Sequence, residues 1–539
     1  MSPLFFGGLS ADLAPLLEAC VADAPPEARA CAIKSMLESA SGRALRNEIG
    51  NWIARIVSID ELVPEIYAPW RPLVRDAIQF VFSRLSATRL AHKLVEQADL
   101  PLDTAPPDRL VRLVSQMPGI QKVGQVVARH RALGAPLRKA LSGLENGMSD
   151  ADPQRIRSII ARQLGPRIRK YAIKIELDIL SEASVSAVVR FTWRSPETLG
   201  REPGVFKVLK PGIRRFFAQD LALLQQLSQM IANSSGYGFA TRHVAEMVAE
   251  VRLLLEHELD FRREQATLLD AFRAYTLSFD VLVPRLIAPL CTAEITAMSD
   301  ENGVKVTDAF KRQPERRRAV AQQLIEALVV VPLLSREEHA IFHADPHAGN
   351  LLYKERSREL VIVDWALTDK LSRDERRHLA MLVIMTTLRN SSGVTEAIKK
   401  LAQTREKLVP EQEQVVTKCV NRFFQELPLN RFAGAIDAMT LLDGIALEGV
   451  RFPASLAMFQ KAVFTLEGVL HDIAGTKADM NGIIVRDFLL RLITSLGLSH
   501  PPLAITDLLA VEWAGVTLPL RLALTAVLPM NARLRLNFV

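Results

Sequence analysis

Three polar side chains between residues 341 and 369 are of the kinds that act on metal-bound phosphate: Asp345, Asn350 and Asp364. Carboxylate and amide oxygens are ligands that Mg²⁺ prefers, and Mg²⁺ usually also takes phosphate oxygens. Asp345, restricted by the proline that follows it, can lie near such a metal without binding it and can orient or deprotonate an acceptor. Phosphoryl transfer requires an arrangement of this kind.

The elements around these residues are expected to bring them together. Residues 351–353 and 360–363 are apolar and predict two short strands with a charged turn between them. If the strands pair antiparallel, Asn350 and Asp364 lie at the same end of the hairpin, about 5 Å apart. A lone Asp after a strand is usually a turn or a helix cap, so the combination, and not either residue alone, indicates a site.

A zinc site is the alternative for the same loop. His343 and His347 are four residues apart, a spacing that would place both on one face of a helix. Pro346 and Gly349 disfavour a helix there. The sequence therefore favours the magnesium interpretation.

The composition limits the class of protein. The chain has 539 residues, a net charge of +7, and 49% hydrophobic and 24% charged residues, which is sufficient for two or three folded domains. Aromatic residues make up only 6% and are not interleaved with basic runs, so we expect no nucleic-acid partner. The four cysteines form no C-x-x-C pair, which indicates a reducing compartment, and the N-terminus resembles no signal peptide.

The C-terminal segment raises the question of a membrane. Residues 513–532 are apolar except for Arg521. A central arginine costs about 2.5–3.5 kcal/mol in a membrane-spanning helix, so we expect this segment to lie at an interface or to be buried. Arg533 and Arg535 behind it suit an anionic lipid surface. The prediction is a cytoplasmic protein that is peripherally associated with a membrane.

The pattern of strands and helices predicts an α+β fold, with a small sheet-containing lobe followed by a larger helical lobe. The predicted parts are a helical N-terminal region, a basic helical extension, the sheet-containing lobe, the helical lobe and an apolar and basic tail, at residues 1–105, 106–171, 172–298, 299–500 and 501–539.

The order of the chemical features is that of a bilobal kinase: a lysine on a strand, a helix with carboxylates, a connector, and then the Asp/Asn/Asp hairpin. Lys207 and Lys210 are the candidate strand lysines, and strand alternation alone does not choose between them. The segment 244–275 is predicted to be one helix, on which Asp260 and Glu264 lie one turn apart.

Several separate stretches resemble motifs of the UbiB-type atypical kinase family, which is linked to coenzyme Q. The likeness covers about residues 110–490. The motifs are Lys122-Val-Gly-Gln125 for K-x-G-Q, residues 205–212 for the lysine strand, Glu258-Leu-Asp260 for E-x-D, residues 343–350 for H-x-D-P-H-x-G-N, and Gly449-Val-Arg-Phe-Pro453 with Lys461 and Glu467 for a late helical signature.

The resemblance implies a bilobal protein-kinase-like fold with a helical N-terminal extension, and it implies roles for individual residues. Asp345 fills the catalytic-loop role, and Asn350 and Asp364 bind Mg²⁺. Lys207, selected over Lys210, contacts the nucleotide phosphates and pairs with Glu264. The remaining residues that the resemblance assigns to the nucleotide pocket are Lys122, Gln125, Glu258, Asp260 and Met298.

The chain departs from the family pattern at three places. The loop expected over the phosphates, residues 181–187, keeps little of the family's alanine-rich sequence, and Glu182 would place negative charge there. The metal motif is Asp364-Trp365-Ala366 where protein kinases have D-F-G. Ser299 follows Met298 where the family usually has an acidic residue.

The resemblance predicts an enzyme that uses ATP or ADP and Mg²⁺ as a kinase or ATPase at a membrane surface, in isoprenoid-quinone (ubiquinone) metabolism. A lipid-like substrate or quinone precursor, an anionic membrane, biosynthetic-complex proteins and a second copy of the chain are the partners it suggests. The alternatives are a small-molecule phosphotransferase for another metabolite and a nucleotide-binding pseudokinase scaffold.

Overall fold

The computed structural model divides the chain into two compact units. Unit 1 comprises residues 1–263 and 287–298, and unit 2 comprises residues 264–286 and 299–539. The structure describes the chain except for residues 1–12, 58, 64, 102, 105, 115–116, 118, 121–151, 184, 235–236, 238–258, 277–279, 404–406, 429–432, 475–504 and 528–539.

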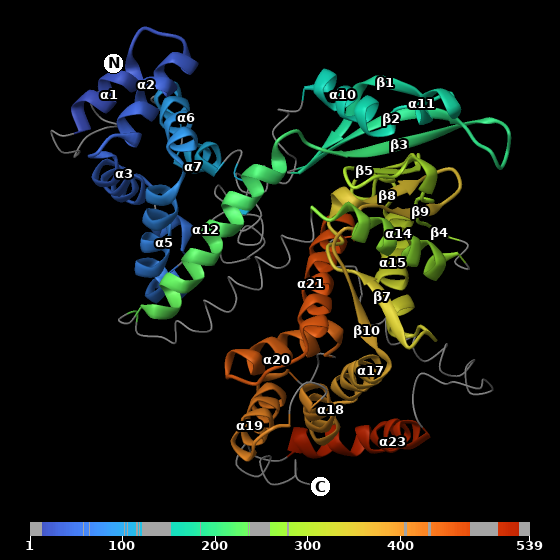
Figure 1. The fold of residues 1–539 in the computed structure, drawn as a ribbon. Coiled ribbons are helices and arrows are strands. Elements are labelled where there is room, and N and C mark those ends of the chain that lie inside the picture. Colours follow the sequence, from blue (N-terminus) through green and yellow to red (C-terminus); the bar gives the residue numbers. More distant parts are fainter. Residues whose placement is uncertain are drawn as a thin grey trace. The chain divides into compact units, whose positions relative to one another are not determined.

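Unit 1 begins with the helices that the sequence predicts, shown in blue in Figure 1. Apolar residues at three- and four-residue steps give each helix a buried face, as at Ile49, Trp52 and Ile53. The helices are α1 (Ala14–Val21), α2 (Pro26–Glu38), α3 (Gly42–Ile56), α4 (Ile59–Leu62), the 3₁₀ segment η2 (Glu65–Trp70), α5 (Arg71–Arg84), α6 (Ala87–Ala98) and α7 (Pro106–Val114). Helix α7 begins at Pro106, a position where proline is favoured at the start of a helix.

A buried ion pair fastens these helices to α12 (Ile213–Asn233). Arg89 of α6 donates to Asp220 of α12 at 2.7 Å, and Asp220 has no exposed surface. The other carboxylate oxygen of Asp220 accepts from the backbone N–H of Gly119 at 3.0 Å. A side chain at position 119 would meet Asp220, because a Cβ there would lie 2.8 Å from that residue's Cβ. Each carboxylate oxygen of Asp220 therefore accepts a hydrogen bond, as a buried carboxylate requires.

The sheet of unit 1 has four strands in the order β1-β2-β3-β5, with β1–β2 and β2–β3 antiparallel. Its core includes Phe191 and Phe206, stacked with ring centres 3.7 Å apart. Gly204 allows this packing, since a Cβ there would lie 2.6 Å from the Phe191 ring. The elements are α10 (Pro153–Leu164), α11 (Arg167–Lys170), β1 (Lys174–Glu182), β2 (Ser186–Arg194), β3 (Arg201–Leu209), the 3₁₀ segment η4 (Ala288–Leu290) and β5 (Ile295–Ser299).

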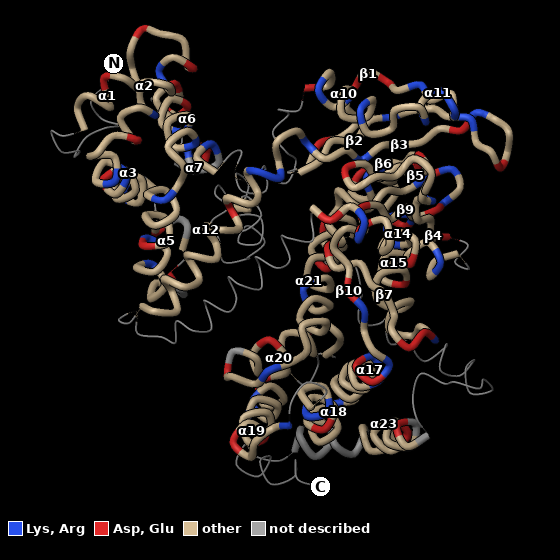
Figure 2. The backbone as a smooth tube through the Cα atoms, viewed as in Figure 1, with Lys and Arg blue, Asp and Glu red and all other residues tan. Residues whose placement is uncertain are grey.

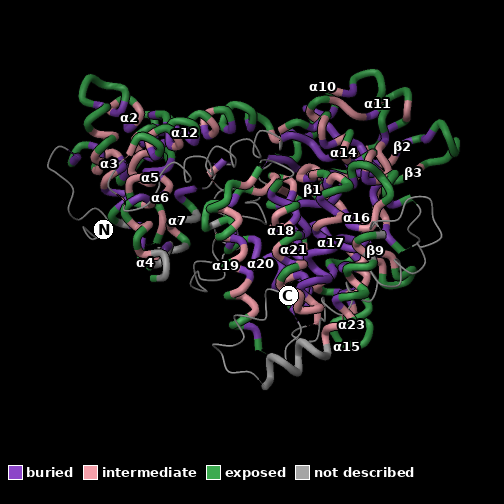
Figure 3. The backbone as a smooth tube through the Cα atoms, turned by 90° about the horizontal axis from the view of Figure 1, so that it is seen from below, coloured by how far each residue is buried: buried purple, intermediate pink, exposed green. Residues whose placement is uncertain are grey.

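Unit 2 is mostly helical, and its helix α17 is buried along most of its length (Figure 3). The helices are α14 (Phe261–Tyr275, whose first residues belong to unit 1), α15 (Pro314–Ile325), the π segment η5 (Glu326–Val330), α16 (Val331–Leu333), the 3₁₀ segment η6 (Ala348–Asn350), α17 (Arg373–Thr387), α18 (Ser391–Gln403), α19 (Pro410–Glu426), α20 (Ala435–Leu447), α21 (Ala454–Ala474) and α23 (Ile505–Val527).

Two small sheets position the polar loop within unit 2. One has the order β4-β9-β8-β6 and the other pairs β10 with β7. The strands are β4 (Val281–Leu282), β6 (Val304–Lys305), β7 (His339–His343), β8 (Leu351–Lys354), β9 (Glu359–Ile362) and β10 (Thr368–Ser372).

Two expectations from the sequence are corrected at this level. The larger lobe, predicted to be helical, contains strands besides the hairpin, because β7 and β10 also pair, with Thr368 opposite His343; both strands carry polar residues that hide the pattern. The helix predicted over 244–275 is also not continuous, since α14 begins only at Phe261. Asp260 precedes it, and its carboxylate accepts from the backbone N–H of Arg263 at 3.1 Å, as a helix cap does.

Candidate active site

The hairpin expected from the sequence is present. Strands β8 and β9 pair antiparallel, with Leu351 opposite Ile362. The backbone N–H of Val363 donates to the carbonyl oxygen of Asn350 at 3.0 Å, which extends the ladder by one step. Asn350 and Asp364 therefore lie at the same end of the hairpin, as predicted.

Asp345 lies next to Asn350, at the same end of the hairpin. It lies two residues after β7, is 5% exposed, and receives a hydrogen bond at its carbonyl oxygen from Nδ2 of Asn350 at 3.1 Å. Because the amide nitrogen of Asn350 donates there, its oxygen Oδ1 is the end that can serve as a ligand. The structure thus brings together the three residues singled out from the sequence.

His347 shapes the loop between Asp345 and Asn350. Its Nδ1 accepts from the backbone N–H of Gly349 at 3.0 Å and caps the short segment η6. A Cβ at Gly349 would lie 2.7 Å from the imidazole, so a side chain at that position would displace the ring. Pro346 and Gly349 do prevent an α-helix, as expected.

His343 is held as a neutral imidazole in the core, 1% exposed. Its Nδ1 accepts from the backbone N–H of Asp345 at 3.2 Å. The proton is therefore on Nε2, which donates to the carbonyl oxygen of Val363 at 3.1 Å. Both ring nitrogens are engaged, so His343 cannot bind zinc without breaking the contacts that hold the loop to the hairpin.

The environment of His343 predicts a stability that depends on pH. Burial lowers the pKa of His343, more strongly than the Asp345 carboxylate raises it. The unfolded chain takes up this proton near the ordinary histidine pKa of about 6.5, so the folded state is fully favoured above that pH and loses stability below it. The loss is at most about 1.4 kcal/mol per pH unit.

We expect the melting temperature to fall between pH 7 and pH 5, and His343→Gln to flatten this part of the curve. His339→Gln, at an exposed position, is the control and should leave the wild-type slope. Melting followed by circular dichroism from pH 5 to 8 measures both, and equal slopes in wild type and His343→Gln would show that another group is responsible.

Asp364 adopts a left-handed backbone conformation with φ of 57°, which Asp tolerates better than most residues. The next residue, Trp365, is 1% exposed and fixes the chain on both sides of the turn. Its indole Nε1 donates to the carbonyl oxygen of Ile362 at 3.0 Å, and its own carbonyl oxygen accepts from Thr267 Oγ1 at 2.7 Å. The strained conformation of Asp364 is therefore imposed by its surroundings.

The donor set fits a magnesium ion better than a structural metal. Within the part of the chain that the structure describes, three or more His, Cys, Asp or Glu side chains nowhere gather into a metal cluster. Mg²⁺ is commonly held by one or two protein oxygens together with waters and substrate phosphates. One carboxylate at Asp364 and one amide oxygen at Asn350 satisfy that requirement.

The two candidate strand lysines have different surroundings. Lys207 is 7% exposed and lies over the Phe261 ring at 5.9 Å, at the start of α14. Lys210 instead forms an ion pair with Glu182, with Nζ and Oε1 2.5 Å apart. Glu264, 4% exposed, lies one turn after Phe261 on α14 and belongs to unit 2; its pairing with Lys207 stays a prediction.

The other predicted pocket residues divide into two groups. Met298 is 8% exposed on β5 of unit 1, and Asp260 caps α14 as described above. Lys122, Gln125 and Glu258 lie outside the described residues.

The connector after Met298 carries an acidic residue that sequence reasoning did not assign. Ser299 Oγ donates to Glu301 at 2.9 Å, and Lys354 Nζ of β8 donates to the other carboxylate oxygen at 2.7 Å. Glu301, three residues after Met298, is thus fixed by two donors. The acidic stretch Asp300-Glu301 was the only signal in the sequence.

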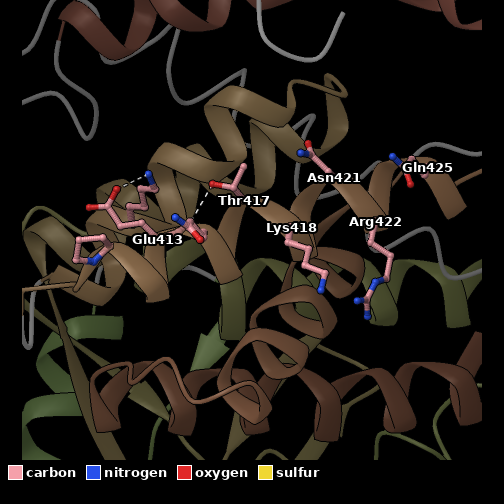
Figure 4. A pocket seen from close by; sticks show the side chains of 9 residues that line it. Glu413, Thr417, Lys418, Asn421, Arg422 and Gln425 are labelled. Carbon is pink, nitrogen blue, oxygen red and sulfur yellow. Dashed lines mark hydrogen bonds and ion pairs between the residues drawn. The ribbon is translucent and has the colours of Figure 1, made fainter. Parts of the chain in front are cut away.

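A surface cleft of about 690 Å³ lies along α19 (Figure 4). None of the predicted site residues lines it, and its walls are polar and charged, with Lys418 and Arg422 on adjacent turns. We therefore place the candidate site at the hairpin and its loop, and not at this cleft.

Comparison with known proteins agrees with the geometry. Residues 143–398 match the model of the ABC1 atypical kinase-like domain. Within these residues the chain is similar to that domain. The resemblance to UbiB-type kinases is confirmed by this match and by relatives of that name, and the α+β, kinase-like fold with a helical N-terminal region is confirmed with it.

The relatives of this chain are distant in sequence. It is 26% identical to the uncharacterized protein sll1770 of Synechocystis over 66% of its own length, and 24% and 26% identical to proteins named "Probable protein kinase UbiB" from Cellvibrio japonicus and Pseudomonas entomophila over 67% and 65%. The matches span 60%, 65% and 64% of those proteins, which is less than two thirds of each.

A solved structure of Rv3197 from Mycobacterium tuberculosis in complex with erythromycin also matches. It has a TM-score of 0.45 and 17% identity, and the match covers 66% of this chain and 87% of that one.

Proposed function

We propose that this chain is an atypical kinase or ATPase that binds ATP or ADP together with Mg²⁺. The observation that carries the proposal is the hairpin that places Asn350 and Asp364 at one end, with Asp345 joined to Asn350 by a hydrogen bond at 3.1 Å. The position of these residues within the matched kinase-like domain supports the same function.

The side chains have separable tasks in this proposal. Asn350 and Asp364 hold Mg²⁺, which would neutralise charge on the phosphates when it is bound. Asp345 orients the acceptor and takes its proton. Lys207 binds the phosphates and is itself oriented by Glu264. Buried carboxylates and a buried lysine suit these tasks, because few waters compete for them.

The remaining predicted residues complete the pocket. Met298 and Glu258 would line the nucleotide site with Gln125, and Lys122 would reach it from the K-x-G-Q segment. A lysine held in this way would leave room for a small acceptor and exclude a protein substrate. These assignments follow from the family resemblance.

The substrate class follows from that resemblance as well. We propose a lipid-like acceptor or quinone precursor and a place in isoprenoid-quinone metabolism, with biosynthetic-complex proteins or a second copy of the chain as partners. A small-molecule phosphotransferase for another metabolite would use the same residues. A pseudokinase scaffold would bind the nucleotide without turnover. The negative charge of Glu182 in the expected phosphate loop favours this scaffold over the phosphotransferase.

The experiment that tests the function measures melting temperature with ATP or ADP, each with and without Mg²⁺. Ligand present at about 100 times its Kd should stabilise the fold by about 2.7 kcal/mol, and EDTA should remove most of this gain. Phosphate release then separates an ATPase from a scaffold. No stabilisation by either nucleotide would contradict the proposal.

Attachment to a membrane surface is proposed from helix α23. Its exposed residues Leu509, Trp513 and Val516 follow helical spacing and form an apolar stripe, with Trp513 69% exposed. Arg377 of α17 binds Asp507 through two hydrogen bonds, at 2.5 and 2.9 Å, and fixes the first turn of the helix to unit 2.

Other observations limit how the chain can meet a membrane. Basic and acidic residues are interspersed over both units in Figure 2, so the stripe and not a charged face carries this argument. Among the described residues, no helix is long and apolar enough to cross a membrane.

We expect the protein to float with vesicles that contain anionic lipid, and high salt to weaken the recovery because surface charges are screened. Replacing both Leu509 and Trp513 with Ala should lower the membrane partition coefficient at least about 100-fold, since each side chain contributes about 1.5–3 kcal/mol when fully buried. Leu199→Ala, at an equally exposed leucine of unit 1, is the control. Unchanged flotation of the double variant would exclude α23 as the contact.

A further inference from the structure

The turn between β1 and β2 is closed by an ion pair across the sheet. Glu182 is the last residue of β1 and lies opposite Ala187 of β2. Lys210 directly follows β3, whose last residue pairs with Ser186 of β2. The Glu182–Lys210 pair, 2.5 Å between Oε1 and Nζ, therefore spans β2 and joins the two strands on either side of it.

Backbone contacts fasten the same turn. The N–H of Ala183 donates to the carbonyl oxygen of Ser186 at 2.8 Å, and the N–H of Lys210 donates to the carbonyl oxygen of Val185 at 3.0 Å. The Val185 side chain is 5% exposed and belongs to a hydrophobic core. The turn is thus held by the backbone contacts of Ala183 and Val185 and by the Glu182–Lys210 ion pair.

The charges of this pair matter because little water screens them. The side chains of Glu182 and Lys210 are 6% and 11% exposed. At low exposure, removing one partner of an ion pair leaves the charge of the other uncompensated in a poorly solvated place. In the resting protein the positive charge of Lys210 is therefore masked by Glu182, three residues from the predicted phosphate ligand Lys207.

We propose that Lys210 is a second anion-binding lysine of the site, and that Glu182 is the built-in anion with which a nucleotide polyphosphate competes. This inference rests on the proposed function, because it takes residues 181–187 as the loop over the phosphates. Nucleotide binding exchanges the carboxylate for phosphate oxygens at Lys210, and Glu182 thereby lowers the affinity for polyphosphates.

Two neutral variants separate this role from a structural one. Glu182→Gln removes the competing carboxylate and should lower the Kd for Mg²⁺–ADP and for inorganic tripolyphosphate about tenfold, which corresponds to about 1.4 kcal/mol. Lys210→Gln removes the phosphate-binding charge and should raise both Kd values by about the same factor. A pair that only braces the turn would move both variants in the same direction, because each breaks the same contact.

Conservative and distant variants keep the test decisive. Lys210→Arg retains the charge and should keep affinity within about threefold of wild type. Lys399→Gln and Glu413→Gln, which break a 2.8 Å lysine–carboxylate pair in unit 2, should change neither Kd. Circular dichroism melting of each variant confirms that it is folded before its Kd is used.

The outcomes distinguish the inference from the function. If wild type binds nucleotide and both Gln variants shift in one direction, the inference is overturned and nucleotide binding stands. Binding by Glu182→Gln where wild type binds little would support the inference directly. If neither binds either probe, the proposed function and the inference both fail.

Discussion

Asp364→Asn is expected to remove most of the Mg²⁺-dependent stabilisation by ATP or ADP. The change replaces the carboxylate that would hold the metal with a neutral amide, at the end of a hairpin where the only other predicted metal ligand is Asn350. Wild type should gain about 2.7 kcal/mol at about 100 times Kd, and the variant should keep less than a third of that.

The choice of Asn follows from the backbone. Asp364 has φ of 57°, and Asn is among the residues that adopt this left-handed conformation most readily. Asp364→Asn therefore changes the charge and leaves the turn intact, whereas Asp364→Ala would add conformational strain. The unliganded melting temperature of the Asn variant should consequently stay close to that of wild type.

Asp374→Asn is the matched control, since Asp374 is an exposed carboxylate in the first turn of α17 of the same unit. It should retain the full nucleotide effect. Melting curves of the three proteins with ADP, with and without Mg²⁺, make the comparison. A full Mg²⁺-dependent shift in Asp364→Asn would move the metal site away from the hairpin.

The hairpin could be predicted because local patterns determine it. Apolar runs on either side of a charged turn specify two strands, and antiparallel pairing then fixes which residues lie at the same end. The placement of Asn350 and Asp364 could therefore be predicted without reference to the rest of the chain. The hydrogen bond from Asn350 to the Asp345 carbonyl adds a contact that composition did not indicate.

Other features depend on residues that are distant in the sequence. Strand alternation assigns Lys210 to a face and cannot name its partner, which is Glu182 on a strand separated from β3 by β2. Strands β7 and β10 stabilise each other by pairing, and neither has the β-branched composition that marks a strand by itself. Asp260 interrupts the helix predicted over 244–275 and caps the start of α14, because its side chain accepts a hydrogen bond from the backbone N–H of Arg263; helical periodicity does not reveal this.

Trp365 is the residue where the chain departs from the D-F-G pattern, and the structure gives the indole a specific task. Its ring packs against His343 and Tyr275, with ring centres 5.0 and 5.8 Å apart. Its Nε1 donates to the carbonyl oxygen of Ile362 at the end of β9. One side chain thus ties together the loop before Asp345, helix α14 and the strand that leads to Asp364.

Trp365→Ala is therefore expected to destabilise unit 2 by about 3–5 kcal/mol, the usual cost of truncating a buried tryptophan. Trp365→Phe keeps most of the ring and loses the bond to the Ile362 carbonyl, which costs about 1 kcal/mol. Trp513→Ala, at a tryptophan of the same unit that is 69% exposed, should change stability by no more than about 0.5 kcal/mol.

Native-state hydrogen exchange, read on peptides of each unit separately, measures these differences without assuming that the two units unfold together. Peptides from β7, β8 and β9 should lose most of their protection in Trp365→Ala and little in Trp365→Phe. Because Asp364 is held in its left-handed conformation by the contacts of Trp365, Trp365→Ala should also lose Mg²⁺-dependent nucleotide binding while Trp513→Ala keeps it. Equal protection of β9 in the Trp365→Ala and Trp513→Ala variants would show that the indole does not hold β9 in place and does not set the geometry of the metal ligand.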